Sequence, residues 1–190
     1  MAELHRKTVE EFRSSPKLPV VVVLDQVRSM HNVGSVFRTA DAFLLEGIVL
    51  CGYTPQPPHR DIQKTALGAT ETVRWEYSPS TKEAVKRLRD QGYSVWAIEQ
   101  TTGSIPLDRV SLGRKWATGP DHEANEPATL SIGEKAALVF GNEVTGVDTK
   151  ILPLCDGCIE IPQLGMKHSL NISVAAGIVL WHLFHQYIKP

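Results

Sequence analysis

Residues 159–178 read IEIPQLGMKHSLNISVAAGI and join the end of an apolar strand to the beginning of an apolar helix. Pro162 cannot continue the strand, and Gly165 permits a tight turn into the helix. From Val174 to Trp181 the side chains are almost wholly apolar, so the pattern predicts a core helix over residues 169–188. The first turn of that helix nevertheless carries three polar side chains: Ser169, Asn171 and Ser173.

The polar opening of this helix has two interpretations. Ser169 is a candidate N-cap, and Lys167 and His168 add positive charge at the end of the helix where backbone N–H groups are unpaired. That combination predicts a site for a phosphate group. A plain serine cap also explains Ser169, but it leaves Asn171 and Ser173 unexplained.

Upstream of this stretch, short apolar runs alternate with helical patterns. Five runs predict buried strands: residues 20–25, 47–52, 93–99, 136–141 and 157–161. Two further patterns predict helices over residues 32–44 and 80–92. Strands that alternate with helices indicate the α/β class, with a mostly parallel sheet covered by helices on both faces.

Two regions lie outside this alternation. Residues 1–18 predict an amphipathic, helical N-terminal arm, and residues 19–190 then form a single domain. Residues 101–133 are rich in Gly, Pro, Thr and charged side chains, which predicts a long loop that is functional or mobile. Trp116 in that loop either stacks on a nucleic-acid base or serves as a packing anchor.

The composition excludes several classes of protein. The 190 residues, 42% of them hydrophobic and 22% charged, suit one globular domain. No run approaches the ~20 apolar residues of a membrane span, and the charged N-terminus lacks an apolar signal core, so a cytoplasmic protein is expected. Because the formal charge is −1, any nucleic-acid site must be a local basic patch.

Residue types that bind metals are few and poorly spaced. Cys155 and Cys158 form a C-x-x-C pair, but zinc needs two more ligands and the sequence has no second pair. A thioredoxin-like pair opens a helix, whereas this one enters a strand, so packing is the expected role. His182 and His185 lack a third ligand, and packing in the core or a dimer interface is expected for them. No metal site is predicted.

Polar side chains follow the first predicted strand, in the segment LDQVRSMHNVGSVFRTADAF of residues 24–43. Asn32 lies where a helix N-cap belongs, and Gly34 and Arg38 share one helix face. An arginine among apolar neighbours is costly unless it is paired or meets an anion. The alternatives are an anion site and a structural salt bridge to one of two acidic residues, Asp25 or Asp41.

A second polar segment, LVFGNEVTGVD of residues 138–148, follows another strand. Gly141 and Gly146 bracket a loop with Asn142 and Glu143 at its tip. This loop is neither a Walker loop nor G-x-G-x-x-G, so the usual phosphate-binding interpretations fail. A carboxylate at the carboxyl end of a parallel strand still marks a candidate site, because ligands bind at that edge.

Together the three segments resemble the three motifs of the SpoU (TrmH) family, in the SPOUT superfamily of RNA methyltransferases. NVGSVFRTADAF resembles the first motif, VFGNEVTGV the second and IEIPQLGMKHSLNISVAAGI the third, in that order along the chain. The resemblance implies a SPOUT-like fold with a deep C-terminal trefoil knot, a rare exception to unknotted topology. It also implies a homodimer, with the C-terminal helix packed against its mate.

The resemblance further implies that the knot binds S-adenosylmethionine, largely through backbone groups. By position, the cofactor contacts fall at five residues: Glu99, Gln100, Gly141, Ile161 and Leu170. The implied reaction moves a methyl group to a ribose 2′-hydroxyl of RNA. Ser173, by contrast, is assigned to helix packing.

The resemblance assigns Arg38 the activating role. A guanidinium keeps its proton, so we expect it to hold the neighbouring phosphate and orient the 2′-oxygen rather than to act as a base. Glu143 would orient Arg38 or Asn32, whereas Asn32 and Asn171 would maintain the geometry of the site. Ser169 would contact the phosphate or Arg38.

The expected substrate is a structured RNA, with tRNA ahead of rRNA. It would be bound by local basic residues: Arg28, Arg60, Lys64 and Lys167. One rival is an RNA-binding protein of this fold that has lost catalysis, but such a protein should lack at least one of the motif residues. Another is a Rossmann or flavodoxin-like oxidoreductase, which needs a glycine-rich turn that LDQVRSMHN does not provide.

Overall fold

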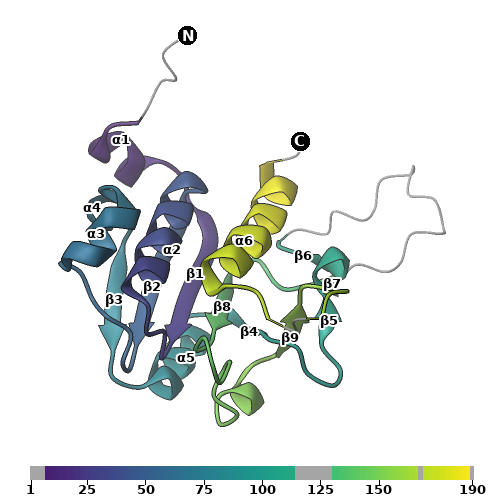
Figure 1. Ribbon diagram of the computed structural model, residues 1–190. Helices are drawn as coiled ribbons and strands as arrows, with labels where there is room; N and C mark the ends of the chain where they lie inside the picture. The colour runs from purple at the N-terminus through teal and green to yellow at the C-terminus, as the bar shows by residue number, and fades with distance from the viewer. Residues whose placement is uncertain (1–6, 114–129, 167–168, 189–190) are drawn as a thin grey trace, which may run out of the picture.

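A seven-stranded sheet forms the centre of the computed structural model, which describes residues 7–113, 130–166 and 169–188 (Figure 1). Its strands lie in the order β3-β2-β1-β8-β4-β9-β5, and every pair is parallel. The strands are β1 (Leu18–Asp25), β2 (Leu45–Cys51), β3 (Trp75–Ser78), β4 (Ser94–Ile98), β5 (Ile105–Pro106), β8 (Ala136–Phe140) and β9 (Gly157–Glu160). The parallel α/β sheet predicted from the sequence is therefore confirmed.

Helices cover both faces of this sheet. One face carries α1 (Val9–Ser14), α2 (Met30–Ala42), α3 (Arg60–Ala66), α4 (Ala69–Thr72) and α6 (Ile172–Ile188). The other face carries α5 (Thr81–Asp90) and the short 3₁₀ helix η2 (Leu152–Leu154). Each layer has its own apolar core, so the sheet is buried from both sides.

Strand β1 shows why the strands read as unbroken apolar runs. Val20, Val22 and Leu24 enter the core beneath α2 and α6, whereas Val21 and Val23 enter the core beneath α5. Successive side chains of a strand point to opposite faces, so a strand buried on both sides needs apolar residues throughout.

Strand β8 occupies the middle of the sheet, although it comes late in the chain. It pairs with β1 on one side and β4 on the other, and Leu138 is opposite both Val22 and Trp96. The carboxyl ends of β1, β4, β8 and β9 consequently lie along one edge. The predicted motif residues follow three of these strands, so the topology brings the motifs together.

The beginnings of two helices differ from the sequence prediction. Helix α2 is capped by Ser29, whose hydroxyl accepts the N–H of Asn32 at 3.3 Å, so the prediction of Asn32 as the N-cap was wrong. Helix α6 begins at Ile172, and Asn171 rather than Ser169 accepts the N–H of Ser173, at 2.9 Å. In α2 the capping residue precedes the predicted one, and in α6 it follows the predicted one.

Three short elements, β3 (Trp75–Ser78), α3 and α4, were not predicted from the sequence. Strand β3 and helices α3 and α4 span four to seven residues, too few for a period to be read. Within residues 101–133, the described part contains β5, the 3₁₀ helix η1 (Leu107–Arg109) and a small sheet of β6 (Val110–Ser111) and β7 (Leu130–Ser131). The described part of this region thus has more regular structure than the predicted loop, and Trp116 lies outside the described residues.

The N-terminal segment is helical at α1, as predicted, and it packs on the domain. Phe12 is buried, and the guanidinium of Arg13 donates to the carbonyl oxygen of Glu71 at 2.9 Å. Strand β1 begins at Leu18, inside the segment predicted as the arm. Among the described residues, no helix combines the length and the apolar character needed to cross a bilayer.

Candidate active site

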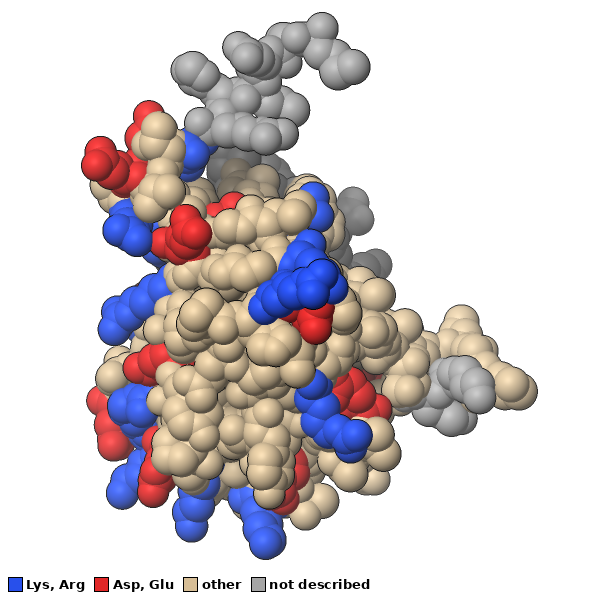
Figure 2. All heavy atoms as spheres, turned by 60° about the vertical axis from the view of Figure 1, so that its left-hand side comes forward, with Lys and Arg blue, Asp and Glu red and all other residues tan. Residues whose placement is uncertain are grey.

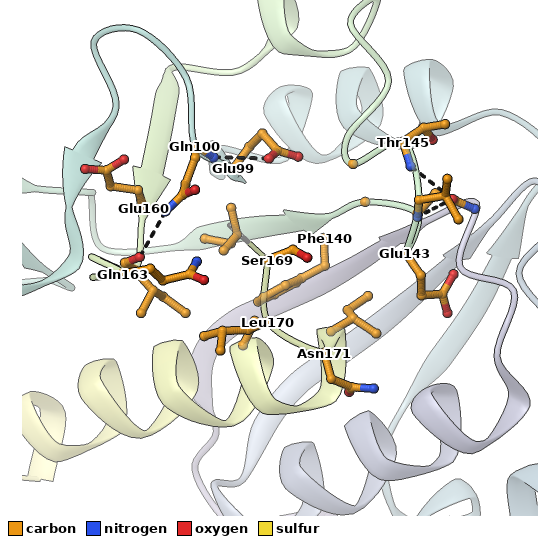
Figure 3. Close-up of a pocket in the computed structure, with 18 residues that line it drawn as sticks. Glu99, Gln100, Phe140, Glu143, Thr145, Glu160, Gln163, Ser169, Leu170 and Asn171 are labelled. Carbon is orange, nitrogen blue, oxygen red and sulfur yellow. Dashed lines mark hydrogen bonds between the residues drawn. The ribbon is translucent and has the colours of Figure 1, made fainter. Parts of the chain in front are cut away.

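A cavity of about 450 Å³ lies at the carboxyl edge of the sheet, between the loops that follow β4, β8 and β9. Figure 3 shows Glu99 and Gln100 on one side of this pocket, Glu143 and Thr145 on the opposite side, and Ser169 and Leu170 between them. Its size is in the range of pockets that hold small ligands. A pocket formed by three loops from one sheet edge is typical of α/β proteins that bind a ligand there.

The five residues predicted as cofactor contacts all line this pocket: Glu99, Gln100, Gly141, Ile161 and Leu170. They come from three loops that are far apart in sequence. The structure therefore brings the five together in one cavity, and their binding of a cofactor stays a prediction. Glu160, Gln163 and Thr145 also line the pocket.

The loop after β8 is closed by its own backbone. The N–H groups of Asn142 and Gly146 each donate to the other's carbonyl oxygen at 2.9 Å. Gly146 has a φ of +69°, and a Cβ on Gly141 would overlap the backbone of Gly146 and Val147. Both glycines are thus required by the loop itself, because a side chain would force it open.

The carboxylate of Glu99 fixes this loop to the end of β4. Its Oε2 accepts the N–H of Val147 at 3.0 Å, and its Oε1 accepts the N–H of Gln100 at 3.1 Å. The sequence prediction gave Glu99 a role through its backbone, whereas the structure gives its side chain a structural role as well. One residue consequently links two walls of the pocket.

Glu143 joins the loop after β8 to the beginning of α2. Its carboxylate accepts the N–H groups of Arg28 at 3.1 Å and Ser29 at 3.0 Å, and the side-chain amide of Asn32 at 3.1 Å. Burial disfavours the charged form, but the hydrogen bonds from Arg28, Ser29 and Asn32 outweigh it, so the pKa of Glu143 is lowered. The glutamate is held ionised at neutral pH.

Asn171 extends this network to the beginning of α6. Its side-chain amide donates to Oδ1 of Asn32 at 3.2 Å, and its own Oδ1 accepts from the backbone N–H and the hydroxyl of Ser173. Ser173 therefore takes part in the capping of α6, and its assignment to helix packing stays a prediction. Residues from all three sequence motifs meet in one hydrogen-bonded group: Asn32, Glu143 and Asn171.

Arg38 lies outside this network. Its side chain is exposed, and the described residues offer it no salt bridge or hydrogen bond. The alternative of a salt bridge to Asp25 or Asp41 was wrong, because both carboxylates have other partners. Asp25 accepts from the hydroxyl of Thr81 and the N–H of Asp148, and Asp41 accepts from the hydroxyl of Thr72.

Three of the four predicted RNA contacts are exposed: Arg28, Arg60 and Lys64. Lys64 forms a salt bridge with Asp61 at 2.6 Å. Lys167 and its neighbour His168 lie outside the described residues. Figure 2 shows basic and acidic side chains interspersed on the face that it presents, so positive charge there is local.

The sequence analysis missed Gln26, which has a φ of +58°. Its carbonyl oxygen accepts the side-chain amide of Asn142 at 2.7 Å, and its Oε1 accepts the N–H of Tyr53 at 2.9 Å. It thereby connects the ends of β1, β2 and β8. A polar residue directly after a buried strand was the available signal, but a left-handed glutamine has no signature in sequence.

The cysteines have no chemical role that the structure supports. Cys51 is buried and Cys155 partly buried, and burial raises the pKa of each thiol to about 12. Cys158 lies in β9, as the sequence predicted. The part of the chain that the structure describes has no cluster of His, Cys, Asp and Glu able to hold a metal ion.

This fold and this site define an α/β protein with a ligand pocket at the carboxyl edge of a parallel sheet. The sequence model of the SpoU rRNA Methylase family matches residues 19–181. The chain therefore belongs to this family, as the resemblance of its three motifs predicted.

Relatives and solved structures agree with this assignment. A tRNA (guanosine(18)-2′-O)-methyltransferase of Thermus thermophilus is 29% identical over 98% of this chain and 85% of its own length. A 23S rRNA (guanosine-2′-O-)-methyltransferase of Vibrio parahaemolyticus is 28% identical over 97% of this chain and 66% of its own. The fold is similar to an AdoMet-bound rRNA methyltransferase of Sinorhizobium meliloti, with a TM-score of 0.72, 24% identity, and coverage of 94% and 61% of the two chains.

Proposed function

We propose that this protein is an S-adenosylmethionine-dependent methyltransferase that methylates a ribose 2′-hydroxyl in structured RNA, with tRNA as the first candidate. One observation carries the proposal. Asn32, Glu143 and Asn171, one from each sequence motif, form a single hydrogen-bonded group beside a pocket lined by all five predicted cofactor contacts.

The chemistry of the pocket fits this cofactor. S-Adenosylmethionine carries two positive groups, a sulfonium and an ammonium, together with a flat adenine ring. The described lining residues include three glutamates, Glu99, Glu143 and Glu160, and no lysine or arginine. Phe140, Ile161 and Leu170 add apolar surface for the ring. Glu99, Gln100, Gly141, Ile161 and Leu170 would hold the cofactor, which supplies the methyl group as an electrophile.

The protein's own groups position the hydroxyl that receives the methyl group. Arg38 would hold the phosphate next to the target ribose and orient the 2′-oxygen, with the guanidinium protonated throughout. The proton of the 2′-hydroxyl would pass to water, and S-adenosylhomocysteine would leave the site. Asn32 and Asn171 keep the two helix beginnings in register, and Glu143 holds Asn32. Ser169 lines the pocket and contacts the phosphate.

The choice of tRNA over rRNA is supported by the extent of the match. The tRNA methyltransferase of Thermus thermophilus shares more of its length with this chain than the rRNA enzyme of Vibrio parahaemolyticus does. An rRNA remains the second candidate, because both relatives are similar in identity. A catalytically inactive RNA-binding protein is disfavoured, because Asn32, Arg38, Glu143, Ser169 and Asn171 are all present.

A trefoil knot, a homodimer and a cytoplasmic location belong to the same proposal. The knot is supported by the insertion of β8 between β1 and β4 and by the position of Ile161, Gln163, Ser169 and Leu170, which line one pocket together with the loop after β8. The homodimer is supported by an exposed stripe on α6, spaced by four and three residues: Val174, Ile178, Trp181, His185 and Ile188. Its opposite face packs into the core.

The test is transfer of labelled methyl groups from S-adenosylmethionine to unmodified tRNA and, separately, to unmodified rRNA. A product that survives alkali as a 2′-O-methylated dinucleotide is expected with tRNA. Transfer to rRNA alone would select the second candidate. No transfer to either RNA, with cofactor binding intact, would overturn the proposed reaction.

A further inference from the structure

Tyr53 is the most exposed aromatic side chain among the described residues. Its relative exposure is 85%, against 51% for Trp181 and Tyr187 and 41% for Tyr77. It lies directly after β2, at the same edge of the sheet as the candidate active site. A ring so fully in water contributes little to the stability of the fold. Single exposed apolar side chains are common, so any role of Tyr53 depends on what surrounds it.

The backbone beneath this ring is held firmly. The N–H of Tyr53 donates to Oε1 of Gln26 at 2.9 Å, and the N–H of Gly52 donates to the carbonyl oxygen of Ser78 at 3.0 Å. Thr54 is buried, and its hydroxyl donates to the carbonyl oxygen of Leu24 and accepts the N–H of Val27, both at 3.0 Å. An exposed ring on a fixed backbone is prearranged for contact with a partner.

The same hydrogen bonds connect Tyr53 to the candidate active site. Gln26, which holds the N–H of Tyr53, also holds the side chain of Asn142. Two residues after Gln26, the N–H of Arg28 donates to the carboxylate of Glu143. The backbone of Tyr53 and the loop that carries Glu143 are thus joined through residues 26–28.

The charges along this route are mainly positive. Arg28 and Arg60 are exposed, and Lys64 is exposed beside Asp61. Helix α3, which carries Arg60 and Lys64, is fixed to α2 through the hydroxyl of Thr65, which donates to the carbonyl oxygen of His31 at 3.0 Å. Arg28 is two residues after Gln26, which holds the N–H of Tyr53, and Arg60 begins the helix that follows Tyr53 in the chain. Exposed aromatic rings and basic side chains together bind unpaired nucleotides, by base stacking and phosphate contacts.

We propose that Tyr53 is a stacking platform for an unpaired base of the RNA substrate, close to the methylated nucleotide, with Arg28 and Arg60 holding the phosphates beside it. This proposal rests on the proposed function, because it takes RNA as the substrate. It assigns the segment between β2 and α3 to substrate recognition and leaves cofactor binding to the pocket.

The experiment compares Tyr53→Ala, Tyr53→Phe and Tyr53→Trp with the wild type, using an unmodified tRNA transcript. Stacking on an aromatic ring is worth a factor of about five to 150 per base. We therefore expect Tyr53→Ala to raise the Kd and KM for the transcript by about that factor. Tyr53→Phe and Tyr53→Trp should bind as the wild type does, because the ring is retained.

The controls separate recognition from folding and from catalysis. Leu67→Ala, which removes another exposed apolar side chain, should leave RNA binding unchanged. The affinity of Tyr53→Ala for S-adenosylmethionine, its oligomeric state and its Tm should match those of the wild type. A Kd for RNA within twofold of wild type, or a change in oligomeric state, would overturn the role of Tyr53.

The two proposals can fail separately. If the wild type methylates RNA and Tyr53→Ala is equally active, only the stacking role is overturned. If the wild type binds RNA through Tyr53 but transfers no methyl group, the stacking role stands and the proposed reaction does not.

Discussion

Asn32 and Arg38 lie six residues apart on helix α2, yet the fold treats them in opposite ways. Asn32 is 9% exposed and is held by Glu143 and Asn171. Arg38 is exposed, and no described residue pairs with it. The position of the asparagine is set by hydrogen bonds within the chain, whereas the guanidinium of the arginine is left to the solvent by the described residues.

This difference separates two kinds of functional residue. The network of Asn32, Glu143 and Asn171 has lost its conformational freedom during folding, so little further ordering is needed when the substrate binds. In the proposed reaction, Arg38 would lose its freedom only when it meets the phosphate of the RNA, and its contribution would then appear in kcat. Removing members of the two groups should therefore affect stability and catalysis in different proportions.

The largest effect is expected for Arg38→Ala. The variant loses the charge that orients the 2′-oxygen, so kcat should fall by at least about 100-fold, the scale of losing one electrostatic contact to the transition state. Because Arg38 has no described partner, the Tm and the affinity for S-adenosylmethionine should stay at wild-type values. Single-turnover methyl transfer measures the loss of rate, and cofactor titration measures the affinity for S-adenosylmethionine.

Two further variants sharpen this result. Arg38→Lys keeps the charge but not the planar fork, and should recover only part of the rate. Arg109→Ala removes a cation outside the site and should leave kcat unchanged. Wild-type methylation by Arg38→Ala would contradict the role of this arginine.

Glu143→Gln should affect both stability and catalysis. The amide can no longer accept all three hydrogen bonds from Arg28, Ser29 and Asn32, and we expect a loss of about 1 kcal/mol. For a domain of this size this loss corresponds to a fall in Tm of about 2–4 °C. Calorimetry and initial rates would show whether the Tm and kcat both fall. An unchanged Tm with a reduced kcat would mean that Glu143, like Arg38, contributes to the reaction and not to stability.

The pH dependence of this stability difference follows from the lowered pKa of Glu143. A carboxylate with a lower pKa in the folded state stabilises the protein above its unfolded pKa, and the benefit is lost as the pH falls through the folded value. The difference in Tm between the wild type and Glu143→Gln should be constant from neutral pH to about pH 5. It should shrink only at more acidic pH, below the ordinary value of 4.5.

Two substitutions of Asn171 separate its role in the helix cap from its hydrogen bond to Asn32. Asn171→Asp keeps an oxygen that accepts the N–H of Ser173 but loses the amide that donates to Asn32. It should therefore retain the stability of the cap while kcat falls. Asn171→Ala loses both, with a further cost of about 1 kcal/mol from the missing cap. Equal Tm values for the two variants would argue against the capping role.

The smallest effect is expected at the cysteines, which take no part in the proposed reaction. Burial raises the thiol pKa of Cys51 and Cys155 to about 12, so almost no thiolate is present at pH 8. Alkylation of both in the folded protein should be slow relative to the unfolded chain. Mass spectrometry after a timed iodoacetamide reaction would measure it.

The sequence predicts the strands and helices that have a regular apolar pattern, together with the approximate place where each pattern ends. The strands β1, β2, β4, β8 and β9 and the helices α2, α5 and α6 follow from apolar patterns, within a few residues at their ends. The place of the site also follows from the sequence. Parallel strands end at one edge of the sheet, and Asn32, Glu143 and Glu99 lie in segments that follow strands.

The remaining features depend on contacts between distant segments. Ser29 caps α2 and Asn171 caps α6, although Asn32 and Ser169 have equally suitable side chains, because the packing of the apolar faces sets where each helix begins. Asp25 and Asp41 bond to Thr81 and Thr72, which are far from them in sequence, so these partners could not be predicted. Gln26 acquires its role only once β2 and β8 lie beside β1.

The central place of β8 has a consequence for synthesis of the chain on the ribosome. β1 and β2 are adjacent in sequence and can pair early, but the seam between β1 and β4 stays open until residues 136–140 have emerged. Pairing between segments so distant in sequence slows folding. Until then β1 and β4 each present an unpaired edge of the kind that joins with other chains. Nascent chains that stop short of β8 are therefore the form of this protein most prone to aggregate.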